Sequence, residues 1–259
     1  MSGCPVNLDT EPGVAAPGVL CLTGGGGKTT LLFALGRAFA AAGQSVLCTT
    51  TTRMHRPLPV PGLSVAFPDD PAGITVPANG LLFAARTAPP GGDAGKVYGY
   101  GPEEVDALHF RGAAAHIVVE ADGAAGRPLK APAEHEPVMP GATRAVIALV
   151  GLSCFLKPFG PETVFRPERV TAITGLLPGD AITPEAVAAL VAHPEGFFKN
   201  APSGAARLLF CNQADLPGTR DVVRALAAVL ARDHPAFLHG LYYGAIQKEG
   251  LRCRKMPTA

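Results

Sequence analysis

Apolar residues along this chain gather into short continuous runs, and these runs alternate with stretches in which apolar residues recur every three or four positions. Residues 19–23 and 44–50 form continuous runs, which predicts strands buried on both faces of a sheet. Between them, residues 29–42 carry an apolar stripe of helical spacing that stops at Gly43, so we expect a helix there. Strand, helix and strand with tight links predict a right-handed βαβ unit.

The same two patterns continue to the C-terminal part of the chain. Further strands are predicted at 116–123, 144–152, 207–215 and 237–244, and further helices at 102–110, 183–193 and 219–233. The proline-rich stretch 53–95 is harder to interpret, with short apolar runs at 63–67 and 81–87 as candidate strands. We therefore expect an α/β fold in which a mostly parallel sheet is covered by helices on both faces.

The expected domain organisation is simple. Residues 18–245 would form one domain, with an insertion around residues 53–100. Residues 1–17 lack a clear pattern and are expected to be a disordered extension, and residues 246–259 are expected to be a tail.

Composition and charge exclude several classes of protein. Hydrophobic residues make up 47% and charged residues 17% of the 259 positions, as in globular chains. A net charge of +1 without a long basic run argues against nucleic acid as the main partner. The six cysteines form no C-x-x-C pair, so neither a zinc finger nor a disulfide framework is indicated. No membrane span or signal peptide is recognisable, so we expect a cytoplasmic protein without a membrane partner.

A glycine run stands between the first predicted strand and its helix. In order, the residues are Gly24, Gly25, Gly26, Gly27, Lys28, Thr29 and Thr30. Glycines let backbone amides turn inward around phosphate oxygens, and a helix N-terminus adds its positive dipole end. In such a phosphate-binding loop Lys28 would reach the β- and γ-phosphates, and the Thr29 hydroxyl would bind Mg²⁺. The spacing G-x-x-G-K-T-T is a shortened form of the full pattern G-x-x-x-x-G-K-[ST].

The end of the second predicted strand distinguishes this loop from a dinucleotide-binding turn. A dinucleotide fold would need a glycine at position 29 and an acidic residue after the second strand. The strand leads instead into a run of four threonines followed by Arg53, so we reject that interpretation. Thr51 and Arg53 lie past the strand, where a hydroxyl and a guanidinium would suit an anion or the water shell of a metal.

Two carboxylates stand in the predicted strand that begins at residue 116. Glu120 and Asp122 are two residues apart, which places both on one side of an extended chain. One of them would hold Mg²⁺ through water, as a Walker B acid does. We favour Asp122 as the metal ligand, because Gly123 follows it and lets the chain approach the phosphates.

The segment after these acids is rich in charge. Arg127 and Lys130 would suit phosphate or an anionic substrate. Glu134, His135 and Glu136 form a dense titratable cluster suited to metal binding or proton transfer, and His135 is the candidate for the proton-transfer role. A solvated loop explains the same composition equally well.

An N-x-x-D motif stands at the end of a later strand. Asn212 and Asp215 resemble the guanine-reading N-K-x-D motif of GTPases, in which the aspartate accepts from two guanine donors that adenine lacks. The lysine of that motif is replaced by Gln213. Both GTP and ATP therefore stay open as the nucleotide, with GTP slightly favoured.

These segments together resemble the YqeC family, accessory proteins of selenium-dependent molybdenum hydroxylases. The matching segments include GGGGKTT, TTTTRM, VEADGAAGRPLKAPAEHEPV, FRPERV, HPEGFFKNAP and FCNQAD, and they cover most of residues 19–216 in order. The block from Val119 to Val138 is the most specific. The resemblance implies a three-layer P-loop NTPase fold and a role in the maturation of a selenium-containing molybdenum cofactor site.

Three functions are consistent with these observations. The first is a Mg²⁺-dependent NTPase that uses GTP or ATP, with Lys28 and Thr29 on the phosphates and metal and with Glu120 and Asp122 on the far side of the metal. The second is a ligase or kinase that activates a small substrate, because the short loop resembles that of Mur-type ligases. The third is a nucleotide-gated chaperone that binds a molybdenum hydroxylase or a selenium-donor protein. Many switches of this type also pair as homodimers across the nucleotide.

Overall fold

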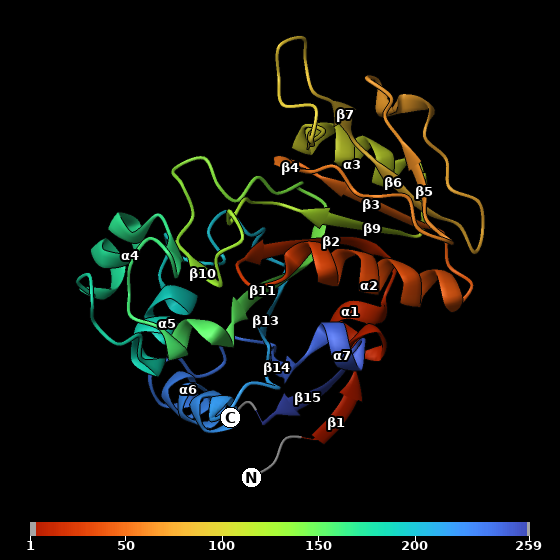
Figure 1. Ribbon diagram of the computed structural model, residues 1–259. Coiled ribbons are helices and arrows are strands. Elements are labelled where there is room, and N and C mark those ends of the chain that lie inside the picture. The colour runs from red at the N-terminus through yellow and green to blue at the C-terminus, as the bar shows by residue number, and fades with distance from the viewer. Residues whose placement is uncertain (1–3, 258–259) are drawn as a thin grey trace.

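The computed structural model describes residues 4–257, and a ten-stranded sheet forms its centre (Figure 1). Its strands are β1 (Cys4–Asn7), β2 (Gly18–Gly24), β3 (Val46–Thr50), β5 (Ser64–Ala66), β6 (Leu81–Ala84), β9 (His116–Glu120), β11 (Thr143–Gly151), β13 (Ala206–Asn212), β14 (Gly240–Gly244) and β15 (Arg252–Met256). They lie in the order β1-β15-β14-β13-β11-β2-β9-β3-β6-β5. All neighbours from β14 to β5 pair in parallel, and β15 is antiparallel to both of its neighbours.

Two smaller sheets and the helices complete the fold. The smaller sheets are a three-stranded one of β4 (Arg53–His55), β8 (Lys96–Tyr98) and β7 (Arg86–Thr87), and the pair β10 (Leu129–Lys130) and β12 (Val164–Phe165). The helices are α1 (Pro12–Ala15), α2 (Lys28–Ala41), α3 (Pro102–Phe110), α4 (Pro167–Thr174), α5 (Pro184–Ala192), α6 (Thr219–Asp233) and α7 (Ile246–Glu249), with 3-10 turns at Leu8–Thr10, Pro71–Gly73 and Leu152–Leu156. None of the helices between residues 4 and 257 is long and apolar enough to cross a bilayer.

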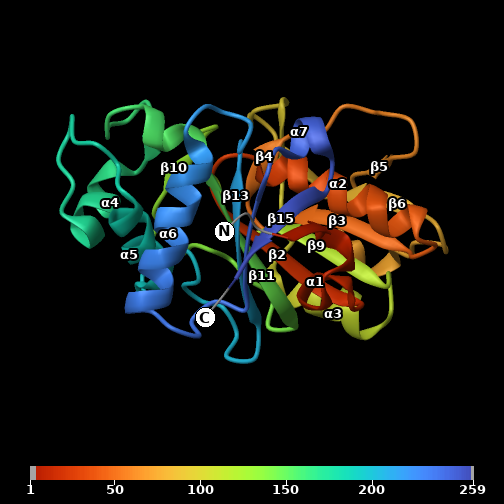
Figure 2. The ribbon, with the colours of Figure 1, turned by 90° about the horizontal axis from the view of Figure 1, so that it is seen from below.

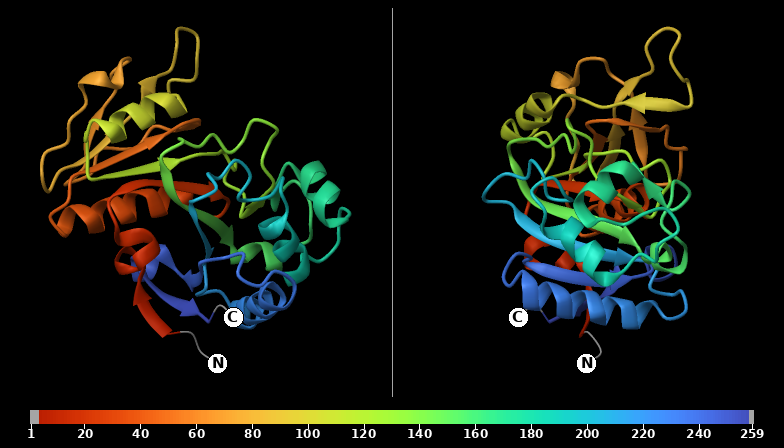
Figure 3. Two further views of the ribbon diagram at one scale, coloured as in Figure 1. Left: turned by 180° about the vertical axis from the view of Figure 1, so that it is seen from behind. Right: turned by 90° about the vertical axis from the view of Figure 1, so that its left-hand side faces the viewer.

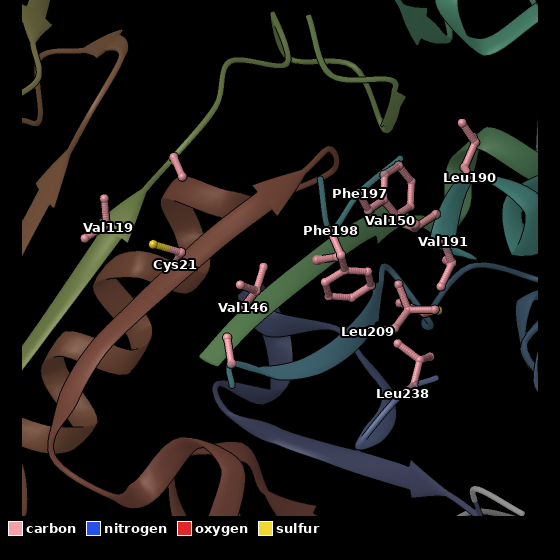
Figure 4. Packing of buried hydrophobic residues seen from close by; sticks show 14 of the residues in the cluster. Cys21, Val119, Val146, Val150, Leu190, Val191, Phe197, Phe198, Leu209 and Leu238 are labelled. Atoms are coloured by element: carbon pink, nitrogen blue, oxygen red, sulfur yellow. The ribbon is translucent and has the colours of Figure 1, made fainter. Parts of the chain in front are cut away.

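Each face of the main sheet buries its own hydrophobic core. Side chains alternate along β2, so that Val19 and Cys21 enter one core while Leu20 and Leu22 enter the other. The first core packs against α3, α4, α5 and α6, and Figure 4 shows part of it. The second core packs against α1, α2 and α7. This arrangement confirms the expected three-layer α/β architecture.

Most of the predicted elements lie where the pattern places them. The helix expected at 102–110 is α3, and the helix expected from Thr183 is α5, whose first turn is capped by the Thr183 hydroxyl accepting from Ala186 N at 3.3 Å. Helix α4 and strands β1 and β15 were not predicted. In α4 Val170 is the buried residue, so its sequence carries little apolar stripe.

Both ends of the described chain belong to the main sheet, which corrects the expected extension and tail. Strand β1 pairs with β15, and Leu8 and Val14 are fully buried in the second core. Arg144 of β11 donates hydrogen bonds to the carbonyls of Gly13 and Val14. The expectation of disorder is therefore wrong for residues 4–15, and the segment 246–256 is helix α7 and strand β15. Residues 1–3 and 258–259 lie outside the described part.

The segment expected as an insertion contributes to two sheets. Strands β5 and β6 extend the main sheet beyond β3, whereas β4, β7 and β8 form the separate three-stranded sheet. Figures 2 and 3 show this part, in orange and yellow, at one end of the molecule and α4 at the other. The carboxyl ends of β2, β3 and β9 come together between these two parts, where ligands bind in parallel sheets.

Candidate functional site

The glycine run turns strand β2 into helix α2. Gly24, Gly26 and Gly27 have φ values of 82°, 83° and 127°, in a region that residues with a side chain rarely adopt. A Cβ atom on Gly26 would lie 2.3 Å from the backbone nitrogen of Gly151 at the end of β11. Glycine is therefore required here both by the backbone angles and by the close approach of a neighbouring strand.

Three of the loop amides already have acceptors within the protein. Gly24 N donates to Asp122 Oδ2 at 3.1 Å, Gly25 N to Leu149 O at 2.9 Å, and Gly26 N to Arg127 O at 3.1 Å. These three amides hold the loop itself together, so the donors left for a phosphate are the amides that follow them.

The donors open to an anion are those at the start of α2. The helix begins at Lys28, and its first hydrogen bond of helical type runs from Leu31 N to Gly27 O at 3.0 Å. The amides before Leu31 lack the partners that a helix interior would give them. Residues from Gly26 to Thr30 line a cleft, so an anion could reach these amides.

Lys28 is buried and makes two contacts beneath the loop. Its Nζ donates to Gly24 O at 2.6 Å and lies 3.1 Å from Asp122 Oδ1. Asp122 is fully buried, and its Oδ2 lies 3.1 Å from Lys130 Nζ. Asp122 is therefore the shared counter-ion of two lysines, and it is not among the residues that line the cleft.

Glu120, rather than Asp122, is the acid beside Thr29. The Thr29 hydroxyl donates to Glu120 Oε2 at 2.7 Å, and both residues line the cleft. Strand β9 ends at Glu120, and the next amide, Ala121 N, still donates to Leu22 O at 3.0 Å. This directs Asp122 beneath the loop. The expected metal role of Asp122 stays a prediction, and Glu120 is the acid of the two that lines the cleft. Burial raises the pKa of the Glu120 carboxyl, although the Lys28 charge and the Thr29 hydrogen bond oppose the shift.

The oxygens of Thr29 and Glu120 fit the preferences of Mg²⁺, which takes hard oxygen ligands and keeps several waters. Within residues 4–257 no group of three His, Cys, Asp or Glu side chains is arranged to hold a metal ion. The suggested metal role of the cluster Glu134, His135 and Glu136 is therefore not supported by the described residues. A Mg²⁺ ion at Thr29 would need nucleotide and water oxygens to complete its coordination.

Glu136 is part of a buried chain of charges. Its Oε2 accepts from Lys130 Nζ at 2.8 Å and from Arg166 Nη1 at 2.6 Å, and its Oε1 accepts from Arg166 Nη2 at 3.1 Å. Burial raises the pKa of Glu136, but Arg166 and Lys130 outweigh this effect and lower it to about 2. Glu136 therefore has a structural role. Arg166, a member of this chain that sequence reasoning did not select, lies in the segment FRPERV that resembles the family.

The cleft above the loop has a volume of about 860 Å³ and is open to solvent. It extends from α2 across the loops that follow β3 and β9, so Thr51, Arg53 and His135 line it as expected from the sequence. The Thr51 hydroxyl donates to Val138 O at 2.6 Å, which fixes its orientation. His135 is exposed at the cleft, and its proposed role in proton transfer stays a prediction.

The two residues of the N-x-x-D motif have different surroundings: Asn212 contacts the glycine loop, and Asp215 is exposed. Asn212 Nδ2 donates to Gly26 O at 2.8 Å, and Asn212 Oδ1 accepts from Ile246 N at 3.2 Å. Asn212 thus connects the glycine loop to the segment after β14. Asp215 lies outside the cleft lining and is paired with Lys248 at 2.5 Å. Base recognition by Asp215 stays a prediction, and it would require Lys248 to release the carboxylate.

Comparison with known proteins identifies the family of the chain. The sequence model of the family described as YqeC protein matches residues 20–168, a range that contains the glycine loop, both acids and His135. A protein of Escherichia coli (strain K12) described as "Uncharacterized protein YqeC" is 40% identical over 202 residues, which are 76% of this chain and 76% of that protein. No solved structure matches the chain. The family match and the relative together show that the chain belongs to the YqeC family.

Proposed function

We propose that this protein binds the triphosphate of GTP or ATP at the start of α2 and hydrolyses it with Mg²⁺. The observation that supports this proposal most strongly is the glycine turn, which leaves the first amides of α2 open to a cleft of about 860 Å³ that Lys28 also lines. Unpaired amides and the helix dipole together attract phosphate at a helix N-terminus. A γ-phosphate at this position would compete with Asp122 for Lys28 Nζ.

The metal in this proposal is held by Thr29 and Glu120. Their side-chain oxygens lie 2.7 Å apart at the edge of the cleft, within reach of a phosphate at the start of α2. A Mg²⁺ ion held there would neutralise negative charge that develops on the phosphate during phosphoryl transfer. A cation beside Glu120 would also favour its charged form and so reverse the effect of burial on its pKa.

The biological setting follows from the resemblance to the family. We propose that nucleotide turnover assists the maturation of selenium-dependent molybdenum hydroxylases in the cytoplasm, with a hydroxylase or a selenium-donor protein as the partner. The nucleotide-gated chaperone is the alternative, in which binding alone changes the affinity for the partner. Release of phosphate distinguishes these two functions, because a chaperone of this kind would bind nucleotide with negligible turnover.

Phosphate release in the presence of Mg²⁺ tests the proposed hydrolysis. We expect Lys28→Ala and Glu120→Gln each to lower the rate by at least about 100-fold, the effect usually seen when one group that stabilises the transition-state charge is removed. Lys28→Ala leaves Asp122 paired with Lys130, so its fold should persist. Arg220→Ala, at an exposed position on α6, is the matched control and should keep the wild-type rate. Equal rates in all four proteins would refute hydrolysis at this site.

A further inference from the structure

The wall of the cleft formed by β4 and β8 presents its polar side chains on one face. These strands pair antiparallel, with Arg53 opposite Tyr98 and His55 opposite Lys96. Residues directly opposite each other share a face, and the alternate residues Met54 and Val97 are buried in the second core. Arg53, Lys96 and the imidazole of His55 therefore lie on the same face of one two-stranded ribbon, and all three line the cleft.

These cations are poorly compensated by the rest of the protein. Within residues 4–257 no carboxylate lies within ion-pair distance of Arg53 or His55, and the Arg53 guanidinium carbon lies 6.0 Å from the centre of the Tyr98 ring. Lys96 lies 3.8 Å from Asp93, whose side chain is 59% exposed, so this pair is weak. Because the whole chain carries a net charge of only +1, the positive charge here is a local feature.

Other residues that line the cleft add positive charge, whereas the carboxylate of Glu136 is already neutralised. Arg127 lines the cleft and lies 3.7 Å from Glu162, a side chain that is 89% exposed. Glu136 also lines the cleft but is bound by Lys130 and by both ends of the Arg166 guanidinium. The part of the cleft beyond the glycine loop thus has an excess of positive charge, an arrangement that raises the local concentration of anions.

We call this part of the cleft, lined by Arg53, His55, Lys96 and Arg127, the outer cleft. We propose that the outer cleft binds a small molecule that carries phosphate or carboxylate groups and lies beside the nucleotide. This proposal rests on the proposed function in one respect, because the nucleotide would occupy the inner part of the cleft from Gly26 to Thr30. The total volume of about 860 Å³ lies near the upper end of the range for small-molecule sites and leaves room for a second ligand. Guanidinium and ammonium groups are the usual partners of both anion types.

Calorimetric titration of two simple anions tests the outer cleft. Inorganic phosphate and succinate serve as the probes for the two chemistries, and each is titrated at constant ionic strength and constant free Mg²⁺. The protein is first saturated with a non-hydrolysable GTP or ATP analogue, so that the glycine loop is occupied. We expect saturable binding of at least one probe, and the probe that binds identifies the preferred group.

Single variants then locate the bound anion. Arg53→Ala and Lys96→Ala should each weaken binding by about tenfold, the usual effect of losing one charge-assisted hydrogen bond. Arg220→Ala removes an exposed cation far along the chain on α6 and should change the affinity by less than about twofold. The proposal is overturned if neither probe binds saturably, or if Arg220→Ala weakens binding as much as Arg53→Ala does.

A further experiment distinguishes failure of the outer cleft from failure of the proposed nucleotide site. Lys28→Ala without nucleotide should lose the glycine-loop site but should keep anion binding that depends on Arg53. If the wild type fails to bind nucleotide and the anion still binds in an Arg53-dependent way, the proposed function fails and the outer cleft stands. If the analogue binds but no anion follows it, the proposed function stands and the outer cleft is refuted.

Discussion

Asp122 is a single buried negative charge placed between two lysines. Its Oδ1 lies 3.1 Å from Lys28 Nζ and its Oδ2 lies 3.1 Å from Lys130 Nζ. An unpaired buried carboxylate would destabilise the fold. Because two lysines contact Asp122, one of them still pairs with the carboxylate when the other is removed or moves away. Lys28 can therefore turn toward a phosphate without leaving Asp122 unpaired. We infer that the role of Asp122 is to hold the Lys28 ammonium beneath the loop.

The glycine loop gives a prediction at the scale of single residues. Gly26→Ala requires an alanine at φ 83° and places Cβ 2.3 Å from Gly151 N, so we expect the free energy of unfolding to fall by about 2–4 kcal/mol. Gly123→Ala is the control, because its Cβ would meet no atom within 4 Å, and it should change stability by less than about 0.5 kcal/mol. Urea unfolding of the three proteins measures both values. Equal stability of the two variants would show that the loop is not held as described.

At the scale of elements, Glu136 joins strand β10 to the segment after β12. Lys130 belongs to β10 and Arg166 follows β12, and Glu136 bridges the two over distances of 2.6–2.8 Å. Lys130 also contacts Asp122 beneath the glycine loop. The wall of the outer cleft is thus connected through buried charges to the lysine that we propose binds the nucleotide.

The ionisation of Glu136 predicts a pH-dependent stability. Its pKa is lowered from the usual 4.5 to about 2 in the folded protein, so its contribution is fully present above about pH 4.5 and is lost as the pH falls toward 2. Each pKa unit corresponds to about 1.4 kcal/mol. Glu136→Gln should be less stable than wild type at pH 7, by about 3 kcal/mol, and this difference should shrink by more than half between pH 5 and pH 3.

Unfolding in urea at several pH values measures this difference. Glu162→Gln, at a side chain that is 89% exposed, is the control and should follow the wild type throughout. A difference between Glu136→Gln and wild type that stays constant from pH 7 to pH 3 would contradict the proposed charge chain.

At the scale of the whole molecule, the continuous apolar runs and the helical stripes were sufficient to predict the central sheet, its parallel pairing and its helical cover. They could not predict the terminal strands, because four residues such as Cys4–Asn7 are too short for alternation to be distinguished from a loop. Strand β1 becomes a strand through its partner β15, which lies about 250 positions later in the chain. The strand conformation of these residues is therefore determined by tertiary pairing rather than by their local sequence pattern.

For a similar reason, the sequence predicted which residues surround the glycine loop but not the contacts between them. The order of strand, glycine run and helix identified Lys28 and Thr29 as neighbours of a cleft. The roles of Glu120 and Asp122 could not be separated, because the choice depends on where β9 ends relative to the backbone of β2. Arg166 lies 30 positions from Glu136, and no spacing rule connects them.

Equilibrium binding of Mg²⁺-GTP and Mg²⁺-ATP, measured by titration calorimetry, tests the central claim most directly. We predict that wild type binds one nucleotide per chain and that Lys28→Ala binds it at least about 100-fold more weakly, which corresponds to about 2.7 kcal/mol of binding free energy. Circular dichroism and urea unfolding would show that the variant is folded. Equally feeble binding of both nucleotides to wild type and to Lys28→Ala would contradict the claim that this loop binds a triphosphate.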